Sequence, residues 1–447
     1  MPRIIKAATP IQILVAGFAL IVLVSAVLLA MPFSSTKHEF QPFVDCLFMT
    51  SSAISTTGLV VADIGKDYTL FGQLVMLVVV QIGGIGYMCF LPLVVVGLLG
   101  GKLTISTRMV LRESMARPGW LDMVKFTKVI LISTLVIESL GAALLVIHSA
   151  PTRGLAASIY PAIYHSINAF CTAGMSIWPD NLMRYQAAVF PNIVIMLVEL
   201  AGGIGFFVLY DIARQSKKFV RGIHPRQLST HSKLALTVTG IVVGVGTVVV
   251  LLTEWPHSRL TAGQMIMAAA FQAVSAETTT GFNSVDIAAL TAPAIFMLTV
   301  LMFIGASPNS TGGGIKTTTL GVMVAGLLAL IRGREDITMF RRRINYKVLQ
   351  SAFSLTLAAG FWCTVVIGLM LLIEPARFDQ IVFEVVSAFG NVGLSMGITT
   401  KLSTLSRLML SATMFFGRLG PLAIGFSLIG KRESPLHHYA EDEVYVG

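Results

Sequence analysis

The chain has 447 residues, of which 55% are hydrophobic and 12% charged, with a mean hydropathy of +0.81. Since soluble globular proteins carry about 25% charged residues, this composition excludes an ordinary soluble domain and predicts a polytopic membrane protein. The formal net charge of +10 would also suit a nucleic-acid partner, so the positions of the basic residues must decide between the two.

The first predicted element is a helix over the apolar run 11–31, which is long enough to span a membrane. No small-residue cleavage site follows it, so we expect a retained span rather than a signal peptide. A shorter segment, 43–54, leads into a Ser/Thr/Gly turn, and a second long apolar run covers 69–99. A helix of ten to thirteen residues is about 20 Å long at most. It cannot cross about 30 Å of hydrocarbon, so the short segment is expected to enter the membrane and turn back.

This order recurs three times along the chain. The four turns are "SAISTTGL" (52–59), "NAFCTAGM" (168–175), "SAETTTGF" (275–282) and "SAFGNVGL" (387–394). Each has an alanine five residues before a glycine, and Gly58, Gly174, Gly281 and Gly393 are separated by 116, 107 and 112 residues. The preceding long helices are predicted at 127–148, 234–253 and 348–373, the short segments at 161–170, 265–277 and 379–389, and the following long runs at 187–210, 292–330 and 404–430.

The repeats predict an all-α polytopic membrane protein with pseudo-fourfold order: four membrane–pore-helix–membrane units, eight transmembrane helices and four half-length helices. The predicted units are 10–100, 127–213, 233–330 with a broken last helix, and 347–430, followed by a tail at 431–447. The connections 102–128, 214–233 and 332–347 hold 18 of the 32 basic residues. By the positive-inside rule, these connections and both termini are cytoplasmic. The charge is thereby explained without nucleic acid.

The turns are the first candidate site. Non-helical backbone within a membrane must be buried in protein or line a wet cavity, so we expect the four turns to meet on one axis. Rings of backbone carbonyls then replace the hydration shell of a cation. No turn side chain carries a charge, which favours a monovalent ion. The predicted ion-binding residues are Thr56, Thr57, Gly58, Thr172, Ala173, Gly174, Thr279, Thr280, Gly281, Asn391, Val392 and Gly393. Glu277 and Glu384 lie nearby and either brace the backbone or contact the ion.

The third unit contains a second candidate, "GASPNSTGGGIKTTT" (305–319). Pro308 and three consecutive glycines break its last long helix. The segment is not a Walker phosphate-binding loop, because Ile315 separates Gly314 from Lys316. In the fourth unit, "FFGRLGPL" (415–422) places Arg418 in an otherwise uncharged span, which indicates a functional residue, with a snorkelling or paired arginine as the alternative. The glycines in "QIGGIGY" (81–87) and "LAGGIGF" (200–206) indicate close helix packing or hinges.

These features together resemble the Trk/Ktr/HKT superfamily of potassium transporters over about residues 10 to 430, and the length and layout resemble its bacterial KtrB type. The resemblance implies a potassium-channel-like fold and potassium uptake, with sodium as an activator. In plant relatives a serine at the first of the four glycines goes with sodium transport, so the glycine at Gly58 implies potassium. It also implies gating by an intramembrane loop, here Ser310, Thr311, Gly312, Gly313, Gly314 and Lys316, together with Arg418. The implied partners are a second copy of the chain, with the tail at the dimer contact, and an octameric cytosolic ring of nucleotide-binding RCK-type subunits.

The four cysteines are scattered, and no metal-ligand set or nucleophile–base pair is present in the sequence. We therefore predict no enzymatic activity, no organic cofactor and no metal other than potassium at the turns. Glu138, His148 and Glu199 are too isolated for a proton relay. Two alternatives remain: a secondary cation carrier, against which the parallel repeats argue, and a non-conducting membrane scaffold.

Overall fold

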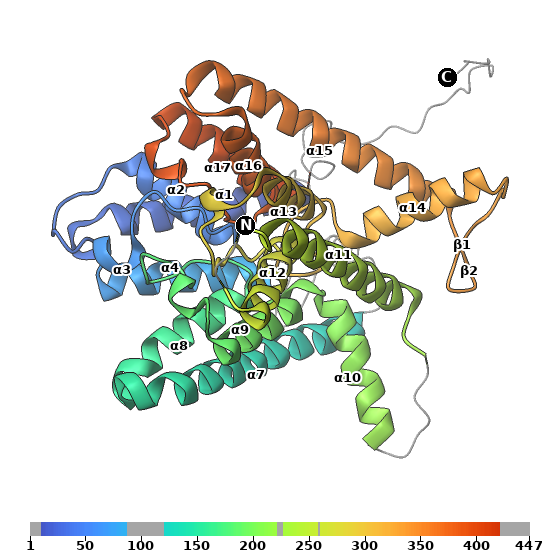
Figure 1. Ribbon diagram of the computed structural model, residues 1–447, viewed down its shortest axis with the longest axis horizontal. Helices are drawn as coiled ribbons and strands as arrows, with labels where there is room; N and C mark the ends of the chain where they lie inside the picture. Colours follow the sequence, from blue (N-terminus) through green and yellow to red (C-terminus); the bar gives the residue numbers. More distant parts are fainter. Residues whose placement is uncertain (1–9, 87–119, 221–226, 258–259, 421–447) are drawn as a thin grey trace, which may run out of the picture.

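The chain folds into a largely helical protein, to which each of the four predicted units contributes three or four of the described α-helices. The computed structural model describes residues 10–86, 120–220, 227–257 and 260–420 (Figure 1). Unit 1 comprises α1 (Pro10–Ala30), α2 (Phe43–Ile54), α3 (Ile64–Asp67) and α4 (Leu70–Ile85); unit 2 comprises α7 (Trp120–Arg153), α8 (Leu155–Phe170), α9 (Val189–Gly203) and α10 (Phe206–Val220). Unit 3 comprises α11 (Thr230–Glu254), α12 (Ala262–Glu277), α13 (Ala292–Ile304) and α14 (Thr317–Ile331); unit 4 comprises α15 (Tyr346–Ile373), α16 (Phe378–Gly390) and α17 (Thr404–Leu419).

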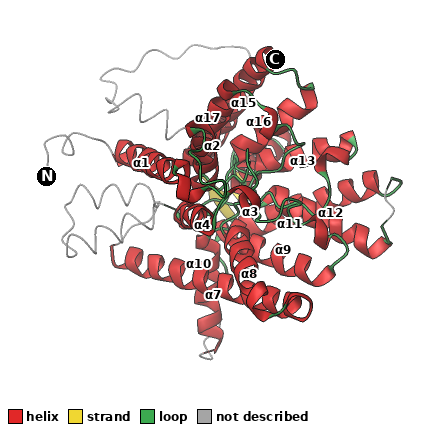
Figure 2. Cartoon of the chain, turned by 90° about the vertical axis from the view of Figure 1, so that its left-hand side faces the viewer, coloured by secondary structure: helices red, strands yellow, loops and turns green. Residues whose placement is uncertain are grey.

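The four units close into a ring. The helix that follows each turn packs on the short helix of the next unit: α4 on α8, α9 on α12, α13 on α16, and α17 on α2. Figure 2 shows the helices radiating from a centre in which the loops gather. The turns predicted to share one axis therefore lie at the middle of the molecule.

The short helices are longer than predicted in two units. α8 begins at Leu155 and α12 at Ala262, so each has 16 residues, against 12 for α2 and 13 for α16. The segment predicted at 161–170 began at Pro161, but a proline removes only one backbone donor, and α8 continues through it. A 16-residue helix is about 24 Å long and remains shorter than the hydrocarbon core.

The helix that follows each turn ends early, as predicted only for the third unit. α13 and α14 are separated by residues 305–316, as expected. The run 187–210, predicted as one helix, is bent by 100° between α9 and α10. Gly205 in this bend has φ +94°, and α4 and α17 likewise end at left-handed glycines, Gly86 and Gly420. A left-handed glycine stops a helix because it turns the next peptide out of the helical path.

Among the described residues, three helices are long and apolar enough to cross a membrane: Phe126–Arg153, Thr230–His257 and Tyr346–Ile373. A fourth is added if the bent pair α9 and α10 counts as one span, and five shorter apolar helices accompany them. The eight predicted spans stay a prediction. The tail 431–447, Cys89 and most of the basic connection 102–128 lie outside the described residues.

The all-α prediction is wrong for one segment between α14 and α15. Strands β1 (Ile337–Met339) and β2 (Arg342–Ile344) form an antiparallel hairpin. Its two linking residues, Phe340 and Arg341, both have left-handed φ, as short hairpins require. The sequence offers neither Asn-Gly nor Asp-Gly there, so the usual hairpin signal is missing.

Glycines allow the helices that follow the turns, α4, α9 and α17, to touch the C-terminal ends of the short helices. A Cβ added to Gly83 would lie 2.0 Å from the carbonyl oxygen of Ile54, and one added to Gly202 would lie 2.0 Å from that of Phe170. Gly417 is similarly placed, at 1.9 Å from the carbonyl oxygen of Phe389. Of the two expectations for these glycines, close packing is the one that the contacts support.

Gly202→Ala should therefore destabilise the protein by about 3 kcal/mol, because two backbones must separate to admit a methyl group. Gly240→Ala is the matched control: Gly240 lies within α11, and a Cβ there meets nothing within 4 Å. This control should match the wild-type protein or melt slightly higher, since alanine favours helix. Thermal melting of the purified variants in detergent measures both, and equal melting temperatures would contradict the packing account.

Candidate functional site

The four turns have the same backbone conformation. The residue two positions before each glycine is left-handed, with φ of 55° at Thr56, 51° at Thr172, 59° at Thr279 and 54° at Asn391. The glycines themselves have φ of 91°, 56°, 84° and 94°. In every turn, the amide before the glycine donates to the carbonyl five residues earlier: Thr57 to Ser52, Ala173 to Asn168, Thr280 to Ser275 and Val392 to Ser387, at 2.8 to 2.9 Å. Each short helix thus ends in one defined turn.

The turns touch one another in a closed cycle. A Cβ added to Gly58 would lie 2.2 Å from the carbonyl oxygen of Ala173, and one added to Gly174 would lie 2.1 Å from that of Thr280. Gly281 stands in the same relation to Val392, at 1.8 Å, and Gly393 to Thr57, at 2.2 Å. The residue preceding one glycine therefore abuts the next glycine around the whole ring, and no side chain fits at any of the four positions. We call the four turns, joined by these contacts, the turn ring.

Side chains of the turn ring hydrogen-bond to one another, whereas four of its backbone carbonyl oxygens do not accept a hydrogen bond in the described part of the chain. Ser55 and Thr57 share a hydrogen bond of 2.7 Å, and the Asn391 amide donates to the Thr57 hydroxyl at 2.9 Å. The carbonyl oxygens of Thr57, Ala173, Thr280 and Val392 accept no hydrogen bond from any residue that the structure describes. Buried carbonyls are normally paired, so these four oxygens are available to a cation.

The 305–316 segment lies against the turn ring and contacts all four left-handed residues. The Thr56 hydroxyl donates to the Thr311 carbonyl oxygen, and the Thr172 hydroxyl donates to the Thr311 hydroxyl, both at 3.0 Å. From the third turn, the Thr279 hydroxyl accepts the Gly313 amide at 3.0 Å. In the fourth turn, a Cβ on Gly313 would lie 2.6 Å from the side-chain oxygen of Asn391. The segment therefore closes one face of the ring.

Two cationic side chains bond to the segment, one from within it and one from α17. The Lys316 ammonium donates to the carbonyl oxygens of Gly312 and Gly313, at 2.6 and 3.0 Å. Arg418 donates to the carbonyl oxygens of Thr311 and Gly83, and at 3.4 Å to that of Gly312. Arg418 is thus paired with backbone of units 1 and 3. The alternative of a paired arginine is observed, and its partners belong to the candidate site.

Besides Lys316, two predicted residues of the segment do not reach the turn ring. The Ser310 hydroxyl accepts the Gly312 amide at 3.3 Å, within the segment itself. Gly314, with φ +80°, packs on the backbone of Ile304 and Gly305, where α13 ends. Both residues shape the segment, whereas Thr311, Gly312 and Gly313 make its contacts with the ring.

The bend in unit 2, which the sequence analysis missed, also positions the segment. The Phe206 amide donates to the Asn309 carbonyl at 2.8 Å, and the Ser307 amide donates to the Gly203 carbonyl at 3.0 Å. A Cβ on Gly205 would lie 2.5 Å from the Pro308 carbonyl oxygen. The signal was present, since "GGIG" occurs at the same place in units 1 and 2.

The two carboxyl groups near the turns differ in their contacts. Glu384 accepts hydrogen bonds from the hydroxyls of Ser395 and Thr399, whereas Oε1 of the buried Glu277 has no hydrogen-bond partner among the described residues. The partners of Glu384 are side chains, so this carboxyl does not brace the backbone directly, which was one of the two expected roles. Within the described residues, no group of three or more His, Cys, Asp or Glu side chains could hold a metal ion.

Comparisons with known proteins agree with one family. The family model TrkH, described as "Cation transport protein", matches residues 4–434. The chain is 37% identical to the "Ktr system potassium uptake protein B" of Bacillus subtilis, over 98% of this chain and 97% of that protein. It is 31% identical to the "Potassium/sodium uptake protein NtpJ" of Enterococcus hirae, over 100% of this chain and 99% of that protein.

A solved structure shares the fold. The chain superposes on the crystal structure of "the Potassium Transporter TrkH from Vibrio parahaemolyticus" with a TM-score of 0.69. The match covers 92% of this chain and 84% of that one, at 19% sequence identity.

Proposed function

Because this chain belongs to the TrkH family of cation transport proteins, we propose that it takes up potassium across a cell membrane through the turn ring. The observation that carries the proposal is the cycle of four glycines, each abutting the carbonyl of the next unit with no room for a side chain. Rings of carbonyl oxygens replace the water around a potassium ion. The similarity to proteins named for potassium uptake supports the same ion.

In this proposal the selectivity filter consists of the carbonyls of the turn ring. Its members are Thr56, Thr57 and Gly58; Thr172, Ala173 and Gly174; Thr279, Thr280 and Gly281; and Asn391, Val392 and Gly393. The ring contains no carboxylate, which favours a monovalent over a divalent ion. The short helices α2, α8, α12 and α16 act as pore helices, whose C-terminal dipole ends attract a cation. Sodium acts as an activator of potassium uptake.

The 305–316 segment forms the gate of the same pore. It lies on one face of the ring and is bonded to three of the turns. Arg418 holds it there and adds a positive charge that repels cations. Opening requires the Thr311 carbonyl to leave both Thr56 and Arg418, so the contacts of Thr311 set the closed state.

The membrane topology and the partners in this proposal are those that the family resemblance implies. The four repeats at 10–100, 127–213, 233–330 and 347–430 form eight spans of the cell membrane, with the termini and the 431–447 tail in the cytoplasm. Two chains pair, and a cytosolic ring of RCK-type subunits docks on the basic inner face. The exposed arginines of the β1–β2 hairpin, Arg341 and Arg342, would belong to that face.

Uptake of potassium, rubidium and sodium into proteoliposomes of the purified chain tests the proposal. Saturable potassium and rubidium uptake well above sodium uptake is expected, with or without a cytosolic partner fraction. Folded protein that passes no cation under either condition would instead support a non-conducting scaffold. Accumulation of potassium against its own gradient, driven by the gradient of a second ion, would instead support a secondary carrier.

Gly58→Ser should lower the preference for potassium over sodium about tenfold, because the added Cβ displaces the Ala173 carbonyl from the ring. Gly154→Ser is the matched control, since Gly154 is also left-handed, with φ +82°, but a Cβ there meets nothing within 4 Å. The ratio of rubidium to sodium uptake measures both variants. A Gly58→Ser protein with the wild-type ratio would place the filter elsewhere.

Arg418→Gln should raise the rate of potassium uptake severalfold, because it removes the charge and the bonds that hold Thr311 against the ring. Arg407→Gln is the control on the same helix, since Arg407 pairs with Asp45 and not with the segment. Deletion of Gly312 to Gly314 should have the same effect as Arg418→Gln. Unchanged or lost uptake in both folded variants would argue against a gate.

A further inference from the structure

On each short helix, the residue nine positions before the turn glycine bonds to the chain just beyond that turn. The residues nine positions before the four glycines are Met49, His165, Gln272 and Glu384, and all are at most 1% exposed. Each bonds to a residue two or three positions after its own glycine. The His165 ring nitrogen Nε2 lies 2.9 Å from the Ser176 hydroxyl, and Glu384 accepts from the Ser395 hydroxyl at 2.9 Å. Gln272 donates to the Ser284 hydroxyl at 3.3 Å, and the Met49 sulfur accepts the Val61 amide at 3.4 Å.

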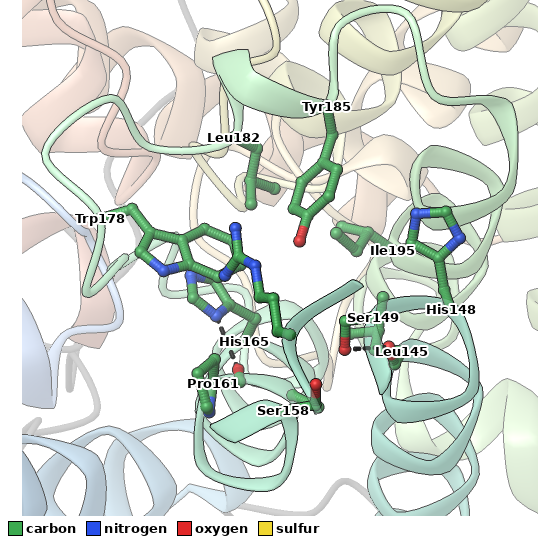
Figure 3. Close-up of a pocket in the computed structure, with 12 residues that line it drawn as sticks. Leu145, His148, Ser149, Ser158, Pro161, His165, Trp178, Leu182, Tyr185 and Ile195 are labelled. Carbon is green, nitrogen blue, oxygen red and sulfur yellow. Dashed lines mark hydrogen bonds between the residues drawn. The ribbon is translucent and has the colours of Figure 1, made fainter. Parts of the chain in front are cut away.

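In unit 2 the donor and acceptor of the His165–Ser176 hydrogen bond can be assigned, and both residues are closely packed. His165 Nδ1 lies 2.7 Å from the Pro161 carbonyl oxygen, which can only accept, so Nδ1 carries the proton and Nε2 accepts from Ser176. The imidazole stacks on Trp178 at 4.1 Å (Figure 3). Ser176 also accepts the Trp178 amide at 3.0 Å. The histidine, the serine and the tryptophan therefore hold one another in place.

In unit 4 a carboxylate, that of Glu384, makes the equivalent bonds to the chain beyond the turn. Glu384 accepts from Ser395 and Thr399, and these two hydroxyls lie 2.9 Å apart. Ser395 also accepts the Gly397 amide at 3.0 Å. Several bonds thus converge on the chain just past Gly393. The contacts in units 1 and 3, a sulfur acceptor and a long amide bond, are weaker.

We propose that these four side chains are positioning residues that set the width of the turn ring and thereby its preference for potassium over sodium. The inference rests on the function proposed above. Because the units follow one another around the ring, the strong contacts of units 2 and 4 lie on one diagonal and the weak contacts of units 1 and 3 on the other. His165 and Glu384 therefore hold the ring on one axis, while the other axis is held less firmly.

The test is a double-mutant cycle on His165 and Ser176, read as the ratio of potassium to sodium uptake in proteoliposomes of the full chain. His165→Leu and Ser176→Ala should each lower the ratio about three- to tenfold, as expected for one lost hydrogen bond. The double variant should fall by less than the product of the two single losses, because both changes remove the His165–Ser176 bond, while Ser176→Ala also removes the bonds to the Trp178 amide and the Asn181 carbonyl. His165→Gln should stay within about twofold of wild type, since an amide can still bond to the hydroxyl, as Gln272 does in unit 3.

Controls separate positioning from general stability. Ser158→Ala alters another buried hydroxyl of α8, one that bonds within its own helix to the Gly154 carbonyl, and should leave the ratio unchanged. Gln272→Leu should lower the ratio less than Glu384→Leu, because Glu384 makes two hydrogen bonds and Gln272 one long one. If His165→Leu does not fold, Ser176→Ala carries the test, since it removes only one oxygen.

The outcomes distinguish this inference from the proposed function. A wild-type chain without selective uptake would overturn the proposed function and the inference with it. A selective wild-type chain whose folded Ser176→Ala variant keeps the full ratio would overturn the inference alone. Equal losses of selectivity in Ser158→Ala and Ser176→Ala would also overturn it, because any disturbance of α8 would then suffice.

Discussion

The structure depends on the absence of side chains at four points where backbones meet. Gly58, Gly174, Gly281 and Gly393 each abut the carbonyl that precedes the next glycine, and a Cβ at any of them would overlap that oxygen. The same constraint recurs one layer outward, where Gly83, Gly202 and Gly417 abut the ends of the short helices. The ring of units can close only because these contacts are backbone to backbone. Their spacing is then fixed by peptide geometry, which varies far less than side-chain rotamers.

The closed ring explains why the segment at 305–316 must be irregular. A helix continued from α13 satisfies its own amides and carbonyls, whereas this segment exchanges its polar groups with Thr56, Thr172, Thr279 and Arg418. Further backbone bonds join it to the α9–α10 bend at Gly203 and Phe206, so the segment depends on both the ring and the bend. The bonds that close the pore in our proposal are the ones that replace the missing helix, so opening must supply other partners for the same groups.

Much of this site was predictable from the sequence because it repeats. The turn glycines, the break after α13 and the unusual position of Arg418 were all visible as local patterns. The partners of Arg418 were not, since Gly83 and Thr311 are distant in sequence and are met only when the ring closes. The position occupied by Met49, His165, Gln272 and Glu384 was missed for another reason. Its four residue types share no chemistry that a motif search would detect, and only their common contact with the chain beyond the glycine relates them.

The most direct test of the central claim is the position of a bound cation in crystals of the protein grown with rubidium or thallium. We predict an anomalous scattering peak on the axis of the turn ring, coordinated by the carbonyl oxygens of Thr57, Ala173, Thr280 and Val392, and absent from crystals grown in sodium alone. A peak at another site with none on this axis, or an equally occupied sodium site within the ring, would contradict a potassium filter built from the four turns.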